Sequence, residues 1–397
     1  MKFLGENVNP NDVMLVNMIY GYGGKDNGYT DSLEIVYRDL NTGEKKLKIL
    51  QKPEVDIYFT RPEFRNYNYN RAYIELDKVD KHTCAFKNIP WYIAKEAGQD
   101  YVNWMKELVE TGNRRDMNKI FKYPYCFGAD MDAESYYRVN WLLEYDNERI
   151  KPITKAYFDI EVDTIDIAGF PRDGECPINI ITFMNEENKS VYTLMLNNPN
   201  NPQIAEFIEN IEEFVEKAHK EFDDIYGVLE YNLYAYNDER DLIKSFFKIV
   251  NALKPDFVMG WNSHGFDIPY TIARCIELGM NPYEVIPHPD FFNKVCRFVK
   301  DVQNFDVKNK SDRFEVSSYS KYIDQMRLYA ATRKGRTELR SFNLNFVGRL
   351  EVGDEKIDYS EVANIKTLPY ENYELFVLYN IKDKQYVLSL LIAGKSC

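Results

Sequence analysis

Short apolar runs and longer amphipathic runs alternate along residues 156–278, and this alternation limits the possible folds more than any other feature. Runs rich in β-branched and aromatic residues predict strands, and runs with a 3.6-residue apolar period predict helices. We expect strands at 156–162, 179–183, 191–196, 230–235 and 256–261, and helices at 202–217, 239–253 and 268–278. Strands followed by helices are typical of an α/β domain.

Residues 1–150 differ from this pattern, because turn signals such as GYGG at 21–24 and NTG at 41–43 recur among Tyr- and Asn-rich segments. Both strand-like and helical runs occur here, which predicts a mixed α and β domain. The strands are expected at 14–20, 33–37, 46–50 and 56–60, and one helix is expected at 90–110. We therefore expect an N-terminal domain over 1–150 and a second domain over 151–390.

Two further elements are predicted near the C-terminus. Residues 305–307 and 314–316 flank the polar turn KNKSD and predict a β-hairpin. Residues 370–392 predict one long closing helix. The fold class expected for the second domain is therefore α/β, and that of the whole chain is α+β.

Composition excludes several classes of protein. The 397 residues contain no apolar run near the ~18–20 residues that a membrane helix needs, and the N-terminus soon becomes polar, unlike a signal peptide. Six cysteines without a CxxC pair argue against a disulfide framework or a zinc cluster. We expect a cytoplasmic protein without a membrane partner. Because the chain has only four histidines, carboxylates would hold any metal.

Charge is unevenly distributed. The formal net charge is -13, yet residues 291–349 contain 13 Lys and Arg against 6 Asp and Glu. A basic segment in an acidic protein is a candidate phosphate-binding surface, and a solvated surface stretch is the alternative. The basic side chains that we expect to contact DNA are Arg313, Lys321, Arg333, Lys334, Arg336 and Arg340. Tyr319, Tyr322 and Phe342 lie between them and could stack bases, although core packing is the alternative, above all for Phe342.

The first chemical motif is the pair Asp159 and Glu161 within the predicted strand AYFDIEV. Residues i and i+2 of a strand point to the same face, so both carboxylates project together. Burying two unpaired carboxylates side by side costs several kcal/mol by order of magnitude, and a divalent cation removes that cost. An edge strand with solvated acids is the alternative.

The second motif follows the predicted strand DFVMGW, where Asn262 to Asp267 form a turn into a helix. A carboxylate at this point can cap the helix, but it also lies at the carboxyl end of a strand, where α/β sheets place ligands. His264, inside the turn, is predicted to be a loop residue without a ligand role.

The third motif is Tyr379 and Asp383 in the predicted closing helix, four residues apart and therefore on one helix face. A surface Tyr–Asp hydrogen bond is the alternative to a functional role. Together the three motifs supply four carboxylates and one tyrosine. Such a set suits two Mg²⁺ or Mn²⁺ ions about 4 Å apart that act on a phosphodiester.

These motifs resemble those of the 3′–5′ exonuclease region of family B DNA polymerases, especially the phage type. The residues that carry the resemblance are YFDIEVDT (157–164), GWNSHGFDIPY (260–270) and YNIKD (379–383). Residues 237–262, YIDQMRLY (322–329) and SFNLNFVGRL (341–350) are also similar. The resemblance is strong over 150–390 and weak over 1–150, and it implies a ribonuclease H-like exonuclease domain preceded by the family's N-terminal domain.

The resemblance also implies roles for individual residues. Asp159, Glu161 and Asp383 would hold the metal that carries the nucleophilic water, and Asp159 would bridge to a second metal supported by Asp267. Tyr379 would orient the water. In the same comparison Phe266 would pack beside the terminal nucleotide and Asn262 would shape the turn. The predicted hairpin resembles the family's strand-separating hairpin.

One departure from the family limits the expected activity. Only 14 residues follow Asp383, and no palm, fingers or thumb motif is present, so residues 391–397 are expected to be a truncated linker. We expect a proofreading exonuclease that acts on single-stranded or primer–template DNA, with a polymerase-core chain in trans and other replisome proteins as partners. A natural split subunit and a truncated or intein-interrupted fragment both remain open. Two other functions also remain open: a stand-alone nuclease for repair or RNA trimming, and a non-catalytic DNA-binding scaffold.

Overall fold

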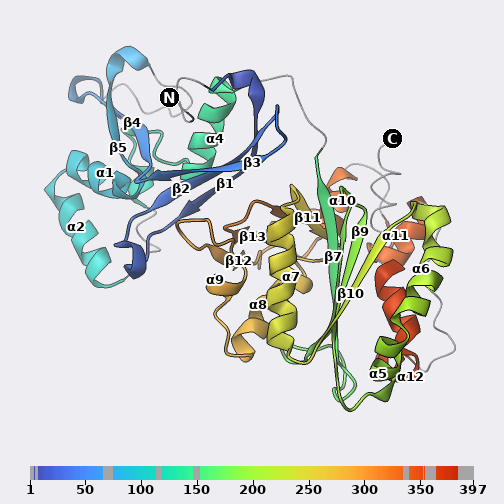
Figure 1. The fold of residues 1–397 in the computed structure, drawn as a ribbon. Coiled ribbons are helices and arrows are strands. Elements are labelled where there is room, and N and C mark those ends of the chain that lie inside the picture. The colour runs from blue at the N-terminus through green and yellow to red at the C-terminus, as the bar shows by residue number, and fades with distance from the viewer. Residues whose placement is uncertain are drawn as a thin grey trace. The chain divides into compact units, whose positions relative to one another are not determined.

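A computed structural model describes residues 4, 8–65, 75–112, 119–145, 153–333, 339–351, 353 and 364–382. The chain forms two compact units (Figure 1). Unit 1 comprises Met1–Lys151 and the short segment Asp290–Asn293, and unit 2 comprises Pro152–Pro289 and Lys294–Cys397. Both units contain helices and sheets, so the predicted mixture of α and β structure is confirmed. Among the described residues, no helix is both long and apolar enough to cross a bilayer.

Among the residues that the structure describes, unit 1 contains two small antiparallel sheets and three α-helices. The first sheet has the order β1 (Val13–Gly21), β2 (Ser32–Asp39), β3 (Lys45–Gln51), and the second has β5 (Val79–Ala85), β4 (Glu54–Thr60), β6 (Cys126–Phe127). The helices are α1 (Ile89–Ala97), α2 (Gln99–Glu110) and α4 (Ala133–Glu144). Their apolar faces share one core, which includes Ile35, Ile57 and Trp141. The single helix predicted over 90–110 is wrong, because Gly98 at φ 112° separates α1 from α2.

Unit 2 is built on a mixed six-stranded sheet. Its order is β10 (Glu230–Tyr236), β9 (Ser190–Leu196), β8 (Ile178–Asn185), β7 (Lys155–Val162), β11 (Phe257–Gly260), β14 (Lys321–Asp324). The pairs formed by β8 with β7 and β9 are antiparallel, and the other pairs are parallel. The five strands predicted over 156–261 are therefore confirmed. Strand β14 joins the sheet from residues about 60 positions beyond β11, and the sequence patterns did not predict it.

Helices cover both faces of this sheet (Figure 1). On one face, Phe158 and Ile160 of β7 pack with α7 (Glu239–Leu253), α8 (Asp267–Glu277) and α9 (Pro282–Val285). On the other face, Tyr157 packs with α5 (Pro202–Glu209), α6 (Ile211–Tyr226), α11 (Leu344–Glu351), α12 (Leu368–Glu371) and the helical residues 373–382. The helix α10 (Gln325–Thr332) follows β14 directly.

Two predicted helices are broken by asparagines. The run over 202–217 divides at Asn210 into α5 and α6. The run over 370–392 divides at Asn372, whose side chain accepts a hydrogen bond from the Leu375 amide and so caps the helical residues 373–382. Asn side chains bind nearby backbone groups and thereby favour helix ends over helix interiors. Residues 383–392 of that prediction lie outside the described residues.

The predicted hairpin is wrong in one of its strands. The partner of β13 (Arg313–Val316) is β12 (Cys296–Val299), and residues 305–307 form no strand. The Asp301 carboxylate accepts hydrogen bonds from the backbone amides of Gln303 and Ser311. These bonds close the intervening residues into a loop, because an Asp side chain competes with strand pairing for backbone donors.

Candidate functional site

Asp159 and Glu161 lie near the end of β7, just beyond the part of the strand that pairs with β11. That pairing covers Lys155–Tyr157, whereas β8 pairs with β7 through Val162. Both acidic side chains are partly exposed, while Phe158 and Ile160 between and beside them are buried. Alternation along the strand places the two acids on the face of Tyr157, which also contacts the helical residues 373–382. The predicted projection of both acids to one face therefore matches the fold.

Asp267 is brought to the same strand. Its carboxylate is 2% exposed and accepts a hydrogen bond from the Ile160 amide at 3.1 Å, between the two acids of β7. Asp267 is the first residue of α8, and the N-cap position is occupied by Phe266 without a side-chain hydrogen bond. The Asp267 carboxylate, in the first turn of α8, is therefore also tied to β7.

The turn between β11 and α8 depends on a tight backbone path. Asn262 has φ 62°, and its carbonyl accepts hydrogen bonds from the Gly265 and Phe266 amides. A Cβ at Gly260 would lie 3.0 Å from the Phe158 carbonyl oxygen, so only glycine lets the end of β11 approach β7 this closely. This approach is what allows Asp267 to reach the Ile160 amide.

Asp324, at the end of β14, also holds the turn between β11 and α8. Its Oδ2 accepts a hydrogen bond from the His264 amide at 3.1 Å. Burial raises the pKa of the Asp324 carboxyl group. The parallel strands β7, β11 and β14 thus end at one edge of the sheet, where α/β folds commonly place ligands. Sequence reasoning missed Asp324; the only signal was an acid directly after the apolar pair Tyr322 and Ile323.

His264 is held neutral inside the turn. Arg327 donates a hydrogen bond to its Nδ1 at 3.3 Å, and because a guanidinium only donates, the ring proton of the neutral form is on Nε2. Burial and the nearby Arg327 charge lower the pKa of His264 to about 4. Arg327 also donates to the Asp312 carbonyl, and so it ties the residues before β13 to the turn. These contacts support the prediction of a loop histidine.

Tyr379 lies in the helical residues 373–382 and is 6% exposed. Its neighbours Phe376, Val377 and Ile381 share a core with Tyr157 of β7, so this helix packs on the face that carries Asp159 and Glu161. Asp383, the next predicted metal ligand, lies outside the described residues.

The donor set fits hard divalent cations. Carboxylate oxygens are the ligands that Mg²⁺ and Mn²⁺ prefer, and the Asp267 carboxylate is hydrogen-bonded to the residue between Asp159 and Glu161. Within the described ranges, no three His, Cys, Asp or Glu side chains are close enough to hold a metal ion. The predicted set includes Asp383 as well, which those ranges do not contain.

The predicted DNA-contacting side chains are in different environments. Arg313 Nε pairs with Glu315 at 2.6 Å, and Arg333 pairs with Glu351. Lys321 and Arg340 are exposed. Lys334 and Arg336 fall in a range that the structure does not describe. The positive charge that two of these residues offer to DNA is therefore partly neutralised within the chain.

Two of the aromatic residues proposed to stack bases are buried. Tyr319 and Tyr322 are each 6% exposed, so our interpretation of these two as base-stacking residues is wrong and core packing applies. An exposed ring occurs elsewhere, in the loop after β7. Phe170 is 79% exposed and contacts the Phe266 ring edge-on, with centroids 5.2 Å apart. Sequence reasoning missed Phe170, which follows the first motif in an irregular loop.

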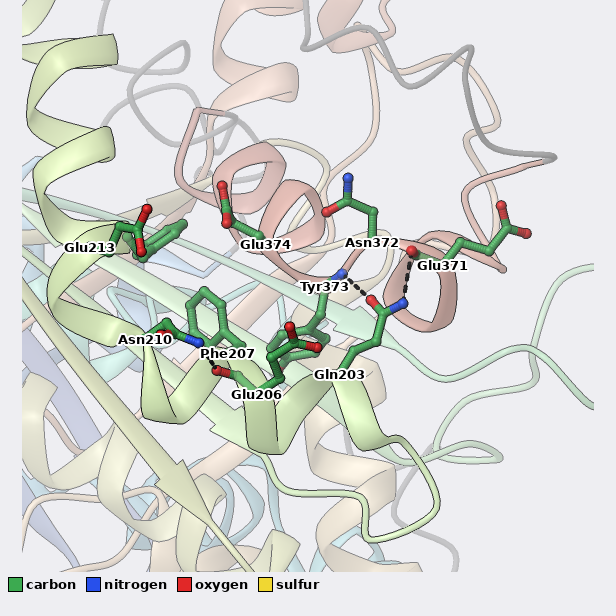
Figure 2. A pocket seen from close by; sticks show the side chains of 10 residues that line it. Gln203, Glu206, Phe207, Asn210, Glu213, Glu371, Asn372, Tyr373 and Glu374 are labelled. Carbon is green, nitrogen blue, oxygen red and sulfur yellow. Dashed lines mark hydrogen bonds between the residues drawn. The ribbon is translucent and has the colours of Figure 1, made fainter.

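A hollow of about 420 Å³ lies away from these residues, between α5, the start of α6 and residues 371–374 (Figure 2). Its lining is Gln203, Glu206, Phe207, Asn210, Glu213, Phe214, Glu371, Asn372, Tyr373 and Glu374. None of these is a predicted site residue. Its four glutamates would repel a phosphate backbone, so the hollow is not where we expect DNA.

Comparison with known proteins gives a consistent result. Residues 126–347 match the family model described as DNA polymerase family B, exonuclease domain. This range contains Asp159, Glu161 and Asp267, and it ends before Tyr379. Exonuclease domains of this family have a ribonuclease H-like fold, which agrees with the mixed sheet of unit 2, and the predicted fold class is confirmed.

Curated relatives are DNA polymerases. The DNA-directed DNA polymerase of Escherichia phage RB69 is 24% identical over 298 residues, which cover 74% of this chain and 30% of that protein. The DNA polymerase delta catalytic subunit of Candida albicans is 22% identical over 250 residues, which cover 60% of this chain and 23% of that protein. The chain thus spans less than a third of the length of these relatives.

Proposed function

The chain belongs to the exonuclease-domain family of the family B DNA polymerases, and from this premise we propose that it is the 3′–5′ proofreading exonuclease portion of such a polymerase. Its substrate would be the 3′ end of single-stranded or frayed DNA. One observation carries the proposal: Asp267 accepts a hydrogen bond from the Ile160 amide between Asp159 and Glu161, so an acid about 100 residues away in sequence is held at the strand that carries the other two. Carboxylate oxygens brought to one strand are ligands that a divalent cation can use.

We assign the following roles to residues of this chain. Asp159 and Glu161, with Asp383, would hold one Mg²⁺ or Mn²⁺ ion, and Asp159 and Asp267 would hold a second. These ions would supply the positive charge that activates a water molecule and stabilises the leaving 3′ oxygen. The Ile160 amide fixes the Asp267 carboxylate, so its charge needs little reorganisation during the reaction.

Tyr379 would position the attacking water through its hydroxyl group. It lies on a helix that packs on the face of β7 carrying Asp159 and Glu161. Phe266 would contact the terminal nucleotide, since its ring lies directly before Asp267 and beside the exposed Phe170. A terminal nucleoside monophosphate would then leave.

The polymerising activity of the relatives would come from other domains. The matched residues make up 30% of the phage RB69 polymerase. We propose a polymerase-core chain as a partner, with unit 1 as its docking platform and a contact to template. A phage-type replicative polymerase acting in the cytoplasm of an infected bacterium is the setting that we propose. Co-purification of a palm-containing chain would support the split polymerase, and a nuclease that works fully alone would favour a repair or RNA-trimming enzyme.

A nuclease assay tests the central proposal. The full chain should shorten a single-stranded oligodeoxynucleotide from its 3′ end in the presence of Mg²⁺, and EDTA should stop the reaction. Asp159→Ala should abolish the activity while the circular dichroism spectrum stays unchanged. Glu187→Ala, in the exposed turn between β8 and β9, is the matched control and should retain activity. Unchanged DNA degradation by Asp159→Ala would overturn the site, and a metal-independent wild type would overturn the mechanism.

A further inference from the structure

Two contacts join the loop that follows β7 to the segment that precedes the last described helix. The Tyr370 hydroxyl group donates a hydrogen bond to the Asp163 carboxylate. The Lys366 ammonium donates to the carbonyl oxygens of Ile167 at 2.8 Å and Gly169 at 3.1 Å. The contacts therefore hold the loop of residues 163–170 near both of its ends.

Both ends of this loop adjoin the candidate site. Asp163 comes two residues after Glu161, and Phe170 follows Gly169 and contacts Phe266, the residue before Asp267. At the other end of these contacts, Tyr370 lies nine positions before Tyr379, which is in the helical residues 373–382. The two contacts thus connect the first and second motifs to the segment that leads into the third.

The segment that carries Lys366 and Tyr370 is itself well fixed at its start. The Asn364 side chain accepts hydrogen bonds from the amides of Lys366 at 2.9 Å and Thr367 at 3.2 Å. Leu368 is fully buried in the core beside the sheet. A chain held in this way can transmit a positional constraint, because moving it would break both the turn and the packing.

The segment is also fixed to α5. Asn201 donates to the Pro369 carbonyl at 2.7 Å. Gln203 donates to the Glu371 carbonyl at 2.8 Å and accepts from the Tyr373 amide at 2.9 Å (Figure 2). The segment is therefore held by hydrogen bonds to α5 and its N-cap as well as by those to the loop.

Tyr370 keeps its proton for this contact. Burial, and then the hydrogen bond to Asp163, raise the pKa of the Tyr370 hydroxyl group well above its ordinary value. The Tyr370 hydroxyl group is therefore the donor of this hydrogen bond.

We propose that Tyr370 and Lys366 are positioning residues of the exonuclease site, an inference that rests on the proposed function. Tyr370 holds the exit of β7 and so fixes the position of Glu161 relative to the helix of Tyr379. Lys366 holds Gly169 and so fixes the Phe170 ring beside Phe266. Neither residue touches the reacting atoms.

The two contacts should have separable effects, because they act at opposite ends of the loop. Tyr370→Phe removes only the hydroxyl group, and Lys366→Met removes the charge and the donors while keeping most of the side-chain length. Tyr373→Phe is the matched control for the first change, since the buried Tyr373 hydroxyl group has no hydrogen-bond partner among the described residues. Lys366→Arg, which restores donors, is the rescue variant for the second.

Three measurements on the full chain test the proposal: hydrogen exchange of residues 163–170, Mn²⁺ binding by titration calorimetry without DNA, and kcat and KM on a single-stranded oligodeoxynucleotide with Mg²⁺. Tyr370→Phe should speed exchange at 163–165, weaken Mn²⁺ binding and lower kcat about tenfold with little change in KM. Lys366→Met should speed exchange at 167–170 and raise KM about fivefold, with partial recovery in Lys366→Arg. Tyr373→Phe should match the wild type in all three.

The outcomes separate this inference from the proposed function. If the wild type does not degrade DNA, the proposed function fails, and the exchange and Mn²⁺ measurements still decide whether the contacts position the loop. If the wild type degrades DNA but Tyr370→Phe and Lys366→Met keep wild-type exchange rates, kcat and KM, the positioning role is overturned alone. Equal changes in Tyr373→Phe and Tyr370→Phe would likewise overturn it, because a general packing effect would then explain both.

Discussion

Asp267 and Ile160 form a hydrogen bond in which the buried carboxylate accepts from the backbone amide at 3.1 Å, although 107 positions separate them in the sequence. The amide belongs to the residue between Asp159 and Glu161. One contact therefore both secures α8 to β7 and sets where the Asp267 charge lies. These two roles can be separated by substitution.

Asp267→Asn should lower exonuclease activity by about 100- to 1,000-fold while leaving stability nearly unchanged, because the amide oxygen of Asn still accepts from the Ile160 amide. Asp267→Ala should lose as much activity and also lower the free energy of unfolding by about 1–3 kcal/mol, because the buried amide loses its acceptor. Oligonucleotide degradation and urea unfolding measure the two effects. Equal unfolding midpoints for the two variants would contradict a structural role of this hydrogen bond.

Acidification should destabilise the fold through His264. Its folded-state pKa of about 4 lies below its ordinary value of 6.5, so between these values the unfolded chain binds a proton that the folded chain does not. Stability is therefore retained above about pH 6.5 and lost progressively as the pH falls toward 4. His264→Gln, which keeps an acceptor for Arg327, should reduce this loss by about 1–3 kcal/mol.

Urea unfolding at a series of pH values measures the effect of His264. The exposed His82 provides the control, and His82→Gln should retain the wild-type pH dependence. A parallel loss of stability in the wild type and in His264→Gln would show that other groups cause the acid sensitivity.

Arg274 of α8 and Glu239 of α7 form a buried ion pair with two hydrogen bonds, at 2.8 and 2.7 Å. Glu239 also accepts from the Ile178 amide of β8 at 2.7 Å. Arg274→Met should lower the free energy of unfolding by about 3–5 kcal/mol, since it leaves a carboxylate buried without its cation. Adding Glu239→Gln should recover part of that loss, and a double-mutant cycle by urea unfolding measures the coupling. Strict additivity would show that the pair does not act as a unit.

Asn293 should stabilise unit 1 although it lies far from Met1–Lys151 in sequence. The side-chain amide of Asn293 donates to the Gly21 and Thr30 carbonyls and to the Ser32 hydroxyl group. Its backbone amide donates to the Glu34 carboxylate. Asn293→Ala should cost about 1–3 kcal/mol by leaving these buried acceptors unpaired. Asn293→Asp should cost more, because a carboxylate cannot donate and would lie near Glu34.

Hydrogen exchange of β2 measures the effect of Asn293. The amides of β2 should exchange faster in both variants, and the amides of β7 and β8 serve as the internal reference. Faster exchange in all three strands alike would contradict a local role for Asn293.

Local patterns sufficed to predict five strands of the unit 2 sheet, β7 to β11. Residues 158–161 of β7 alternate between buried apolar and partly exposed acidic side chains, and the residue types alone show this alternation. The helix breaks at Asn210 and Asn372 were missed, because one asparagine changes helix propensity by only a few tenths of a kcal/mol. The side-chain contacts at the helix end decide the break, and they are invisible in a propensity average.

Contacts between segments that are distant in the sequence could not be predicted from local patterns. Asp324 matters because β14 pairs with β11, and nothing in the local pattern of residues 321–324 specifies that partner. Lys366 and Tyr370 gain their roles from a loop about 200 positions earlier. The sequence also does not show which arginines have partners within the chain: Arg313 and Arg333 have acidic partners, and Arg327 contacts carbonyl oxygens and His264.

The assignment of residues 290–293 to unit 1 bears on the order in which the chain can fold as it is made. Asn293 leaves the ribosome roughly 140 residues after Lys151, a delay of about 7–30 s at ordinary rates of synthesis. During that interval the acceptors on Gly21, Thr30 and Ser32 must stay hydrated. Unit 1 therefore stays without these hydrogen bonds until most of unit 2 has been synthesised, and a ribosome that stalls before residue 293 would leave it in that state.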